Sequence, residues 1–300
     1  MTLLELITNA AQQLTDAGVA FGHGTTNAFD EAAWLVLWQL GLPFDSSLAD
    51  PADDATSVAN QAVTPEQIAQ AATLLIARIT SRKPAAYLTR EAWLQGVPFY
   101  VDERAIVPRS LIAELVVNGD LDYWLSDATQ RVLDLCTGNG SLGILAAMTY
   151  PEVSVDGADI SDDALAVAQI NVDRHSLQGR VTLMHSDGMA SVKGPYDLIL
   201  CNPPYVNAQS MADLPAEYRA EPPLALDGNI EGGSDGMDFI RHLLREAPAH
   251  MSDKAILVLE IGNEQTHFDA AFPKLSPIWL DTAAGDAQVL LLTRAELLKL

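Results

Sequence analysis

The chain contains few cysteines, few basic residues and no long apolar runs. Two of its 300 residues are cysteine, and 17 lysines and arginines stand against 40 aspartates and glutamates, a formal net charge of −23. Two cysteines without a Cys/His cluster at metal-ligand spacing provide neither a disulfide framework nor a metal site. A strongly acidic surface repels phosphate backbones, which makes free DNA or RNA a poor substrate and a lysine-rich protein a good one. The charge fits a generally acidic proteome equally well.

The lack of long apolar runs also bears on location. No run is long enough to cross a bilayer, and residues 1–13 carry acidic and polar side chains where a secretory signal would carry basic ones. We therefore expect a cytoplasmic protein that does not associate with membranes. Hydrophobic residues make up 49% of the 300, enough for one large domain and one small one.

The first 82 residues show helical periodicity. Apolar residues recur at helix spacing within 3–14, 33–40 and 68–79, and Pro65 suits the first turn of the third segment. The stretch 46–64 is rich in Asp, Ala and Ser and indicates a loop or a weak helix. We predict a small helical domain over 1–82. Because it carries no catalytic constellation, its expected role is to help recognise a large substrate.

Residues 83–110 have a different pattern, with short aromatic and apolar runs broken by Gly96 and Pro98. This pattern predicts a β-hairpin that links the domains. A helix is expected from residue 111 to about 125, with Ser110 as its cap. The aromatic residues of the hairpin can simply be buried. Alternatively Phe99, Tyr100 and Arg109 line the mouth of a pocket, and Phe99 and Arg109 are candidate substrate-binding residues.

Strands and helices alternate from 111 to 300, the third predicted domain. The predicted strands are 131–135, 153–158, 181–185, 196–201 and 255–261, and the predicted helices are 142–150, 164–174 and 238–249. Such alternation requires a mostly parallel, twisted sheet with helices on both faces. Two further strands, 278–280 and 289–292, flank a Gly-Asp turn and predict an antiparallel hairpin at the sheet edge. The expected fold class is therefore α/β, a Rossmann-like sheet of seven strands.

The strand 196–201 ends abruptly at Asn202-Pro203-Pro204-Tyr205. The first proline forces the asparagine into an extended conformation and the pair removes two backbone donors, so a rigid loop must follow. Open α/β sheets bind ligands at the carboxyl ends of central strands. There the Asn202 carboxamide and the Pro203 carbonyl can accept both hydrogens of a planar NH2 group while Tyr205 covers one face. This predicts methylation of an amide or aromatic amine, although an isolated Pro-Pro-Tyr more often only ends a strand.

A glycine-rich segment follows the first strand of the sheet and opens a helix. Gly138, Gly140 and Gly143 match the dinucleotide fingerprint, in which bare backbone lets a ligand approach the helix start. Asp134 lies four residues before the first glycine, and Asp-x-x-x-Gly-x-Gly resembles the S-adenosylmethionine loop of class I methyltransferases. That resemblance implies that Asp134 helps hold the cationic amino-acid end of the cofactor. The other candidate cofactor-binding residues of this loop are Cys136, Thr137, Gly138, Asn139 and Gly140.

Two more acids stand at strand ends. Asp159, followed by Ile160, ends the second strand, where a carboxylate can accept both ribose hydroxyl hydrogens. A helix-capping or turn role is the alternative for Asp159. After the third strand, Asp187-Gly188 offers an acid where class I methyltransferases bind the adenine amine. The loop, the two acids and the Asn-Pro-Pro-Tyr together favour S-adenosyl-L-methionine as the cofactor, with no metal.

Residues from about 85 to 292, together with the helical region before them, resemble the HemK-type protein-(glutamine) methyltransferases. Members of this family methylate the side-chain amide of one glutamine in a translation protein. The family's Asn-Pro-Pro-Tyr matches residues 202–205, its cofactor loop matches 136–140 and its ribose acid matches Asp159. The resemblance implies a class I methyltransferase fold, S-adenosyl-L-methionine as cofactor and a protein as substrate.

Two segments indicate the branch of this family. Release-factor methyltransferases have an acid-Thr-Glu run soon after their Pro-Arg, whereas here Pro108-Arg109 precedes Ser-Leu-Ile-Ala-Glu. Residues 213–219, followed by Glu221-Pro222, resemble the branch that acts on large-subunit ribosomal protein three. The glycine-rich loop between 226 and 235 is several residues longer than the family pattern. The predicted substrate is therefore a glutamine of a basic ribosomal protein.

Other functions remain open at this point. A DNA or RNA adenine amino-methyltransferase would present the same planar NH2 to the same motif, and a release-factor glutamine methyltransferase shares the fold and cofactor. A scaffold protein that binds the cofactor without methyl transfer comes from another class. The acidic charge argues against nucleic acid, because base-flipping enzymes must also hold a phosphate backbone. A nicotinamide dehydrogenase would leave the Asn-Pro-Pro-Tyr without a role.

Overall fold

The computed structural model describes residues 1–50 and 52–300 and divides the chain into two compact units. The helical unit comprises Met1–Glu91 together with Pro215–Ala220, and the sheet unit comprises Ala92–Leu214 and Glu221–Leu300. A short segment from far along the chain thus belongs to the helical unit. The loop predicted over 46–64 includes position 51, which lies outside the described residues. Among the described residues, no helix is both long and apolar enough to cross a membrane.

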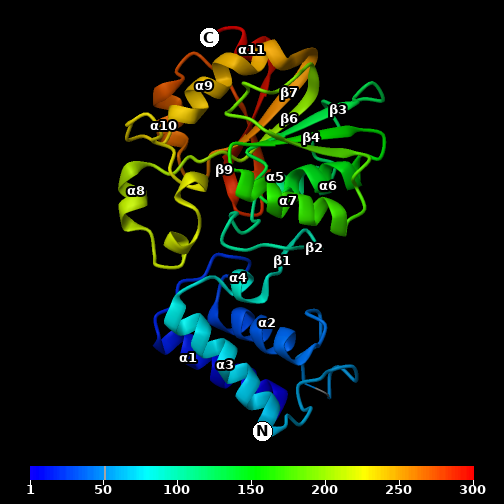
Figure 1. The fold of residues 1–300 in the computed structure, drawn as a ribbon, viewed down its shortest axis with the longest axis vertical. Coiled ribbons are helices and arrows are strands. Elements are labelled where there is room, and N and C mark those ends of the chain that lie inside the picture. The colour runs from blue at the N-terminus through cyan, green and yellow to red at the C-terminus, as the bar shows by residue number, and fades with distance from the viewer. Residues whose placement is uncertain (51) are drawn as a thin grey trace. The chain divides into compact units, whose positions relative to one another are not determined.

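Three packed helices and a short fourth form the helical unit (Figure 1). Their bounds are α1 Leu3–Asp16, α2 Ala28–Leu40, α3 Pro65–Ser81 and α4 Ala85–Thr89. Apolar residues at helical spacing, among them Ile7, Leu14 and Leu35, are buried between the helices. A capping box starts α1, in which the Thr2 hydroxyl accepts a hydrogen bond from the Glu5 amide and the Glu5 carboxylate accepts one from the Thr2 amide.

Buried charges join the segment 215–220 to the helices of this unit. The Arg78 side chain is fully buried, and its Nε donates to Glu31 Oε1 at 2.8 Å. Its Nη1 lies 3.4 Å from Oε1 of Glu217, which is also fully buried and lies 2.7 Å from Arg82 Nε. Burial raises the pKa of Glu31 and the neighbouring Arg78 opposes that shift. Since a buried charge is tolerated only when paired, these contacts hold Glu217 within the helical unit.

The sheet unit contains a hairpin and a seven-stranded sheet. The hairpin pairs β1 Ala92–Leu94 with β2 Val97–Phe99. The sheet strands are β3 Arg131–Leu135, β4 Ser154–Asp159, β5 Val181–His185, β6 Tyr196–Cys201, β7 Met251–Glu260, β8 Ile278–Thr282 and β9 Gly285–Thr293. Their order is β5-β4-β3-β6-β7-β9-β8; the strands from β5 to β7 are parallel, and β9 runs antiparallel to both neighbours. The predicted seven-stranded, mostly parallel sheet with an antiparallel edge is confirmed.

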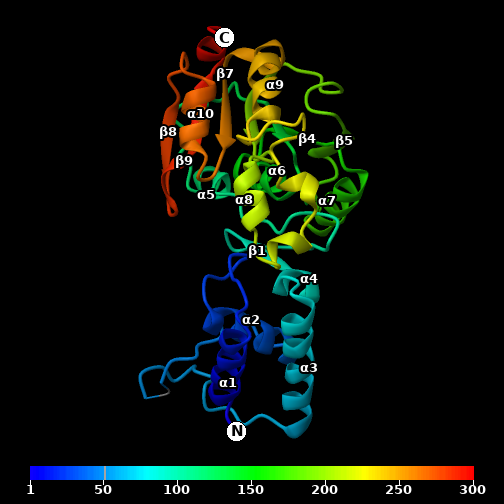
Figure 2. The ribbon, with the colours of Figure 1, turned by 90° about the vertical axis from the view of Figure 1, so that its left-hand side faces the viewer.

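Helices cover both faces of this sheet (Figures 1 and 2). The helices of the sheet unit are α5 Ile112–Val117, α6 Ser141–Thr149, α7 Asp162–Arg174, α8 Ala208–Asp213, α9 Asp238–Glu246, α10 Gln265–Ala271 and α11 Arg294–Leu297. Of these, α8 has no buried residue and belongs to the loop after β6. Three 3₁₀ turns are η1 Tyr218–Ala220, which belongs to the helical unit, and η2 Pro223–Ala225 and η3 Ala247–His250 of the sheet unit. Successive strand residues point to opposite faces, so Leu198 packs with α5 and α6 whereas Ile199 packs with α9 and α10.

The helix predicted from 111 to about 125 is wrong in length, because α5 ends at Val117. Gly119 adopts a left-handed conformation, with φ of 77°. Its amide donates to the Val116 carbonyl at 3.2 Å, and the Asp120 amide donates to the Leu115 carbonyl at 3.0 Å. This pair of bonds is a Schellman termination, which a glycine adopts without steric cost.

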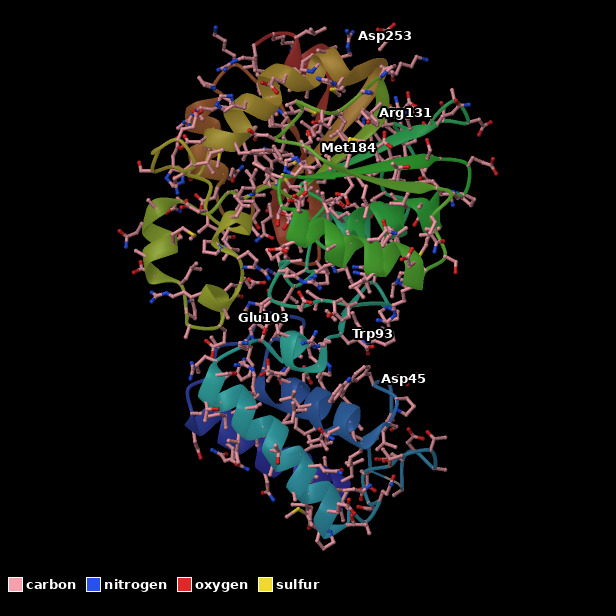
Figure 3. The ribbon with its side chains drawn as sticks, viewed as in Figure 1. Asp45, Trp93, Glu103, Arg131, Met184 and Asp253 are labelled. Carbon is pink, nitrogen blue, oxygen red and sulfur yellow. The ribbon has the colours of Figure 1, made fainter. Side chains whose placement is uncertain are left out.

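An ionic and aromatic cluster occupies the amino ends of the central strands. Arg131, labelled in Figure 3, begins β3; its guanidinium lies 4.4 Å from the centroid of the Tyr196 ring and donates to Asp156 at 2.7 Å. The Tyr196 hydroxyl donates to the same carboxylate at 2.6 Å. These contacts hold β3, β4 and β6 together at their amino ends. The glycine-rich segment and the Asn-Pro-Pro-Tyr both emerge at the opposite, carboxyl edge.

Candidate active site

Strand register brings the sequence motifs together at the carboxyl edge of the sheet. Leu135 of β3 pairs with Ala158 of β4 and with Cys201 of β6. The residues that follow these three positions are the glycine loop, here residues 136–140, then Asp159, and the turn 202–205, here the Asn-Pro-Pro-Tyr turn. Neighbouring parallel strands thus place the predicted cofactor and amide-binding motifs side by side.

The glycine loop has an unusual backbone. Cys136, Gly138 and Gly140 all have positive φ, of 60°, 55° and 84°. At Gly140 a side chain would also be crowded, because a Cβ would lie 3.2 Å from the Cβ of Ala168 on α7. The glycine therefore allows the start of α6 to lie close against α7. This leaves a loop with bare backbone at a helix start, which suits close approach of a ligand.

Asp134 lies beneath this loop. It is 1% exposed, and its Oδ2 accepts hydrogen bonds from the Thr137 hydroxyl at 2.5 Å and the Gly143 amide at 2.8 Å. Burial raises the pKa of Asp134 to about 7, against the two hydrogen bonds that favour its charge. Its second oxygen, Oδ1, is buried and has no hydrogen-bond partner among the described residues. The carboxyl group therefore organises the loop and keeps one acceptor free.

A buried asparagine that the sequence analysis did not single out supports the loop from α7. The Asn171 side chain donates to the carbonyls of Asn139 and Tyr100, both at 2.9 Å, and accepts from the Tyr100 amide at 2.7 Å. Its position within the apolar stripe of α7, between Ala168 and Val172, was the available signal. The Asn139 side chain is itself 2% exposed, and its Nδ2 has no partner in the described part of the chain.

The two acids at strand ends lie in different surroundings. Asp159 accepts hydrogen bonds from the amides of Gly138 at 2.8 Å and Ser161 at 2.9 Å, and burial raises its pKa. It therefore makes the turn contact that was its alternative role and also touches the glycine loop. Ile160 beside it is 43% exposed. Asp187 is exposed after β5, and Gly188 follows with φ of 51°.

The two cysteines are free thiols at this edge of the sheet. Cys201 is buried and Cys136 is half-buried, and a hydrogen bond between them together with burial raises the pKa of the Cys136 thiol. Within residues 1–50 and 52–300, no three His, Cys, Asp or Glu side chains are grouped so that they could hold one metal ion.

The Asn-Pro-Pro-Tyr turn presents one free polar side chain. Asn202 is half-buried, and no described residue forms a hydrogen bond with its carboxamide. Pro203 and Pro204 are buried. The chain that follows is held to the long loop, because the Val206 amide donates to the Leu226 carbonyl at 2.9 Å. The turn is thus fixed on both sides while the Asn202 carboxamide remains available.

Tyr205 is half-buried and backs the turn. Its ring lies against Gly262, where a Cβ would stand 2.7 Å from Tyr205 Cε2. Its hydroxyl lies 3.4 Å from Oε1 of Glu260, a carboxylate that sequence reasoning missed. Burial, with the charge of Glu260, raises the pKa of the Tyr205 phenol. The structure therefore gives Tyr205 contacts within the protein in addition to its predicted place beside the substrate.

The candidate substrate-binding residues before α5 differ in placement. Arg109 forms two hydrogen bonds with Glu221, at 2.6 and 2.8 Å, and so ties the chain before α5 to the long loop after the turn. Phe99 is 0% exposed and packs edge-on against His175, with ring centroids 5.3 Å apart. The expectation that Phe99 lines a pocket mouth is therefore wrong, because none of its side chain reaches a surface.

The strand order, the antiparallel strand β9 and the motifs at the carboxyl ends of the parallel strands are those of a class I methyltransferase. A family model described as the methyltransferase small domain matches residues 120–217. The catalytic domain of hMettl16, solved in complex with the MAT2A 3'UTR hairpin 6, superposes with a TM-score of 0.51, covering 77% of this chain and 81% of that one. At 12% sequence identity, this likeness concerns the fold alone.

Curated relatives define the family more narrowly. The ribosomal protein uL3 glutamine methyltransferase of Bordetella pertussis is 51% identical over 299 residues, covering 99% of this chain and 96% of the relative. Its counterpart in Burkholderia pseudomallei is 47% identical over 306 residues, covering 99% and 95%. The chain belongs to the family of ribosomal protein uL3 glutamine methyltransferases.

Proposed function

We propose that this chain transfers a methyl group from S-adenosyl-L-methionine to the side-chain amide nitrogen of a glutamine in ribosomal protein uL3. Family membership supports the reaction and the substrate. The observation that carries the proposal is the free Asn202 carboxamide, held half-buried at the end of β6 beside the glycine loop. An acceptor at this position can bind an N–H of an incoming amide.

The residues at the carboxyl edge fit the proposed cofactor. S-adenosylmethionine would supply an electrophilic methyl group on a sulfonium. The buried Asp134 Oδ1 and Asn139 Nδ2 have no partners among the described residues, and the loop backbone is bare at Gly138 and Gly140. We infer that Asp159 serves the ribose and Asp187 the adenine, as the family pattern implies. The proposed cofactor-binding residues are Asp134, Cys136, Thr137, Gly138, Asn139, Gly140, Asp159, Ile160, Asp187, Gly188 and Asn202.

The task of the Asn-Pro-Pro-Tyr turn would be to orient a poor nucleophile. An amide nitrogen shares its lone pair with the carbonyl, so it reacts only when both N–H bonds are held and its free face points at the electrophile. We assign this role to Asn202 Oδ1 and the Pro203 carbonyl, with Pro204 stiffening the turn and Tyr205 packing beside the amide. As positive charge develops on the nitrogen, the two oxygens would stabilise it and the acidified N–H could pass its proton to water.

Charge and domain organisation support a protein substrate. A net charge of −23 attracts a basic partner such as a ribosomal protein and repels nucleic acid. We propose that the helical domain predicted over 1–82, linked by the hairpin segment 83–110 to the methyltransferase domain 111–300, helps to recognise this partner. Arg109 would contribute from the chain before α5. The cytoplasm, expected from the sequence, is where such a substrate would be met.

The reaction can be tested directly. The purified chain is incubated with labelled S-adenosylmethionine and, in separate reactions, with hypomethylated uL3, a release factor and an adenine-containing RNA. Mass spectrometry then identifies the labelled residue. Label on one glutamine of uL3 is the expected result, whereas label confined to the release factor or to adenine would contradict the proposal.

A further inference from the structure

We propose that Glu260, outside the Asn-Pro-Pro-Tyr motif, is a positioning residue for the methyl-transfer step, acting through Tyr205 without touching the substrate. The inference rests on the proposed function, in which Asn202 and Pro203 hold the reacting amide. Three sets of contacts support it, and all lie within the sheet unit.

The first set is the environment of Glu260 at the end of β7. Its neighbour Leu259 pairs with Cys201, so Glu260 stands one residue beyond the last pair of β6 and β7, beside the start of the turn. Glu260 is 4% exposed, and its Oε2 accepts hydrogen bonds from the Ser110 hydroxyl at 2.5 Å and the Leu111 amide at 2.9 Å. Two charge-assisted bonds to one oxygen fix the carboxylate and leave Oε1 facing Tyr205.

The second set consists of the contacts that Gly262 and Glu260 make with the Tyr205 side chain. Gly262, two residues beyond Glu260, has φ of 53° and lies against the hydroxyl end of the ring. A side chain at 262 would overlap the ring, since its Cβ would lie 2.7 Å from Cε2 and 3.1 Å from the hydroxyl oxygen. Glu260 Oε1 faces that hydroxyl at 3.4 Å, a long contact for a hydrogen bond. The ring position is therefore determined mainly by packing and oriented by the carboxylate.

The third set repeats the arrangement further along both segments, four residues beyond Glu260 and two residues beyond Tyr205. Glu264 is 7% exposed, and its Oε1 accepts a hydrogen bond from Asn207 Nδ2 at 2.7 Å. Thus Glu260 and Glu264 contact Tyr205 and Asn207 respectively, so the chain 260–264 backs the chain 205–207. This correspondence indicates that the end of β7 serves as a rigid support for the turn.

A displacement of Tyr205 would reach the reacting groups. Pro203 and Pro204 are the only residues between Asn202 and Tyr205, and each proline ring fixes its own φ. The turn therefore transmits movement at Tyr205 to the Asn202 carboxamide. Because misorientation of a bound amide slows the chemical step more than it weakens binding, the loss should appear in kcat and leave KM little changed.

The matched test uses Glu260→Gln, Tyr205→Phe and the double variant, with Glu152→Gln as the control. A glutamine at 260 keeps the volume, and its oxygen can accept from Ser110 and Leu111, but it then presents an NH2 donor to Tyr205 in place of the carboxylate acceptor. Glu152 is exposed in the turn before β4, at the amino ends of the parallel strands and therefore at the end of the sheet opposite to the site. Methylation of uL3 is measured at saturating cofactor, with cofactor affinity by calorimetry and folding by circular dichroism.

We expect Glu260→Gln and Tyr205→Phe each to lower kcat about tenfold, with KM and cofactor affinity within about twofold of the wild type. The double variant should be no slower than the slower single variant, because both changes disturb one contact. Glu152→Gln should match the wild type. A wild-type kcat for Glu260→Gln, or independent losses that multiply in the double variant, would overturn the inference and leave the proposed function standing. A wild-type chain inactive toward every substrate would overturn both.

A second variant keeps the test decisive if Glu260→Gln folds poorly. Gly262→Ala should lower kcat in the wild-type background, where the added Cβ meets the Tyr205 ring. In a Tyr205→Ala background the ring is gone, so the same substitution should have no further effect on kcat. An equal additional loss in both backgrounds would show that residue 262 acts on the backbone alone, and would contradict positioning through Tyr205.

Discussion

Arg109 and Glu221, separated by 112 positions in the sequence, are joined by two short hydrogen bonds of 2.6 and 2.8 Å. The Glu221 side chain is fully buried, and the Val107 amide also donates to it at 2.9 Å. This pair fixes the long loop after the Asn-Pro-Pro-Tyr turn to the chain before α5. Arg109, predicted as a substrate-binding residue, therefore has a structural partner of its own.

Removing the arginine of this pair should destabilise the sheet unit. Arg109→Ala leaves a buried carboxylate without its cation, which costs about 3 kcal/mol of unfolding free energy. Asp253→Ala is the control, because Asp253 is 97% exposed in its pair with Arg294 and such pairs contribute about 0.5 kcal/mol. Urea unfolding monitored by circular dichroism measures both. Equal losses in the two variants would argue against the importance of the buried pair.

Two glycines with positive φ should respond differently to alanine. At Gly140 the new Cβ would crowd Ala168 at 3.2 Å and would strain a backbone with φ of 84°, so the glycine loop should shift and S-adenosylmethionine binding should weaken about tenfold. Gly41 ends α2 with φ of 65° and has no atom within 4 Å of a built Cβ. Gly41→Ala should cost about 1 kcal/mol of stability through backbone strain and leave cofactor affinity unchanged. Calorimetric titration of both variants distinguishes the effects, and unchanged affinity in Gly140→Ala would exclude the loop as the cofactor site.

The sheet was predictable because its signals are local. The apolar runs around Leu133 and Leu198 alternate between two buried faces, and the prolines at 203 and 204 end a strand without reference to the rest of the fold. The glycine loop and the Asn-Pro-Pro-Tyr turn were predictable in the same way, because each directly follows an apolar strand in the sequence. The helix after Ser110 was predicted too long because the apolar periodicity outweighed the termination signal of Gly119.

The missed residues depend on contacts between distant positions. Asn171 and Glu260 each satisfy backbone amides far away in the sequence, Tyr100 for the first and Leu111 for the second. A local pattern can mark a polar residue in an apolar stripe, as at Asn171, but it does not identify the hydrogen-bond partner, which comes close only after the chain has folded. The burial of Phe99 was ambiguous for the same reason, since an aromatic residue in a hairpin fits a core as well as a pocket.

The Asp134 carboxyl group should make stability depend on pH. Its pKa is raised to about 7 in the folded protein, so the native state retains a proton that the unfolded chain releases near pH 4. The stabilisation is complete below pH 4 and is lost as pH rises through 7. Between pH 5 and 8 the wild type should therefore lose about 3 kcal/mol relative to Asp134→Asn. Urea unfolding of the cofactor-free proteins measures this, and parallel pH profiles would contradict the assignment.

The buried charges of the helical unit predict that the stability lost on removing Arg78 can be recovered by neutralising its carboxylate partners. Arg78→Met should destabilise the protein by about 3 kcal/mol, because Glu31 is then buried without its cation and Glu217 keeps only Arg82. Adding Glu31→Gln and Glu217→Gln to that variant removes the uncompensated charge of Glu31 and the charge of Glu217 that only Arg82 then balances, and should restore most of the loss. Thermal unfolding of the single and triple variants measures the effect. A triple variant less stable than Arg78→Met would show that the hydrogen bonds, and not the charges, determine the cost.

The central claim is that Asn202 holds the reacting amide, and the most direct measurement is the single-turnover rate of uL3 methylation by Asn202→Ala at saturating S-adenosylmethionine. The exposed residue Asn118, at the end of α5, provides the matched Asn→Ala control. We predict that Asn202→Ala slows methyl transfer by at least about a hundredfold while it still binds the cofactor, weakened by no more than the loss of one contact, and that Asn118→Ala changes neither. A methylation rate for Asn202→Ala within about threefold of the wild type would contradict this role of the turn.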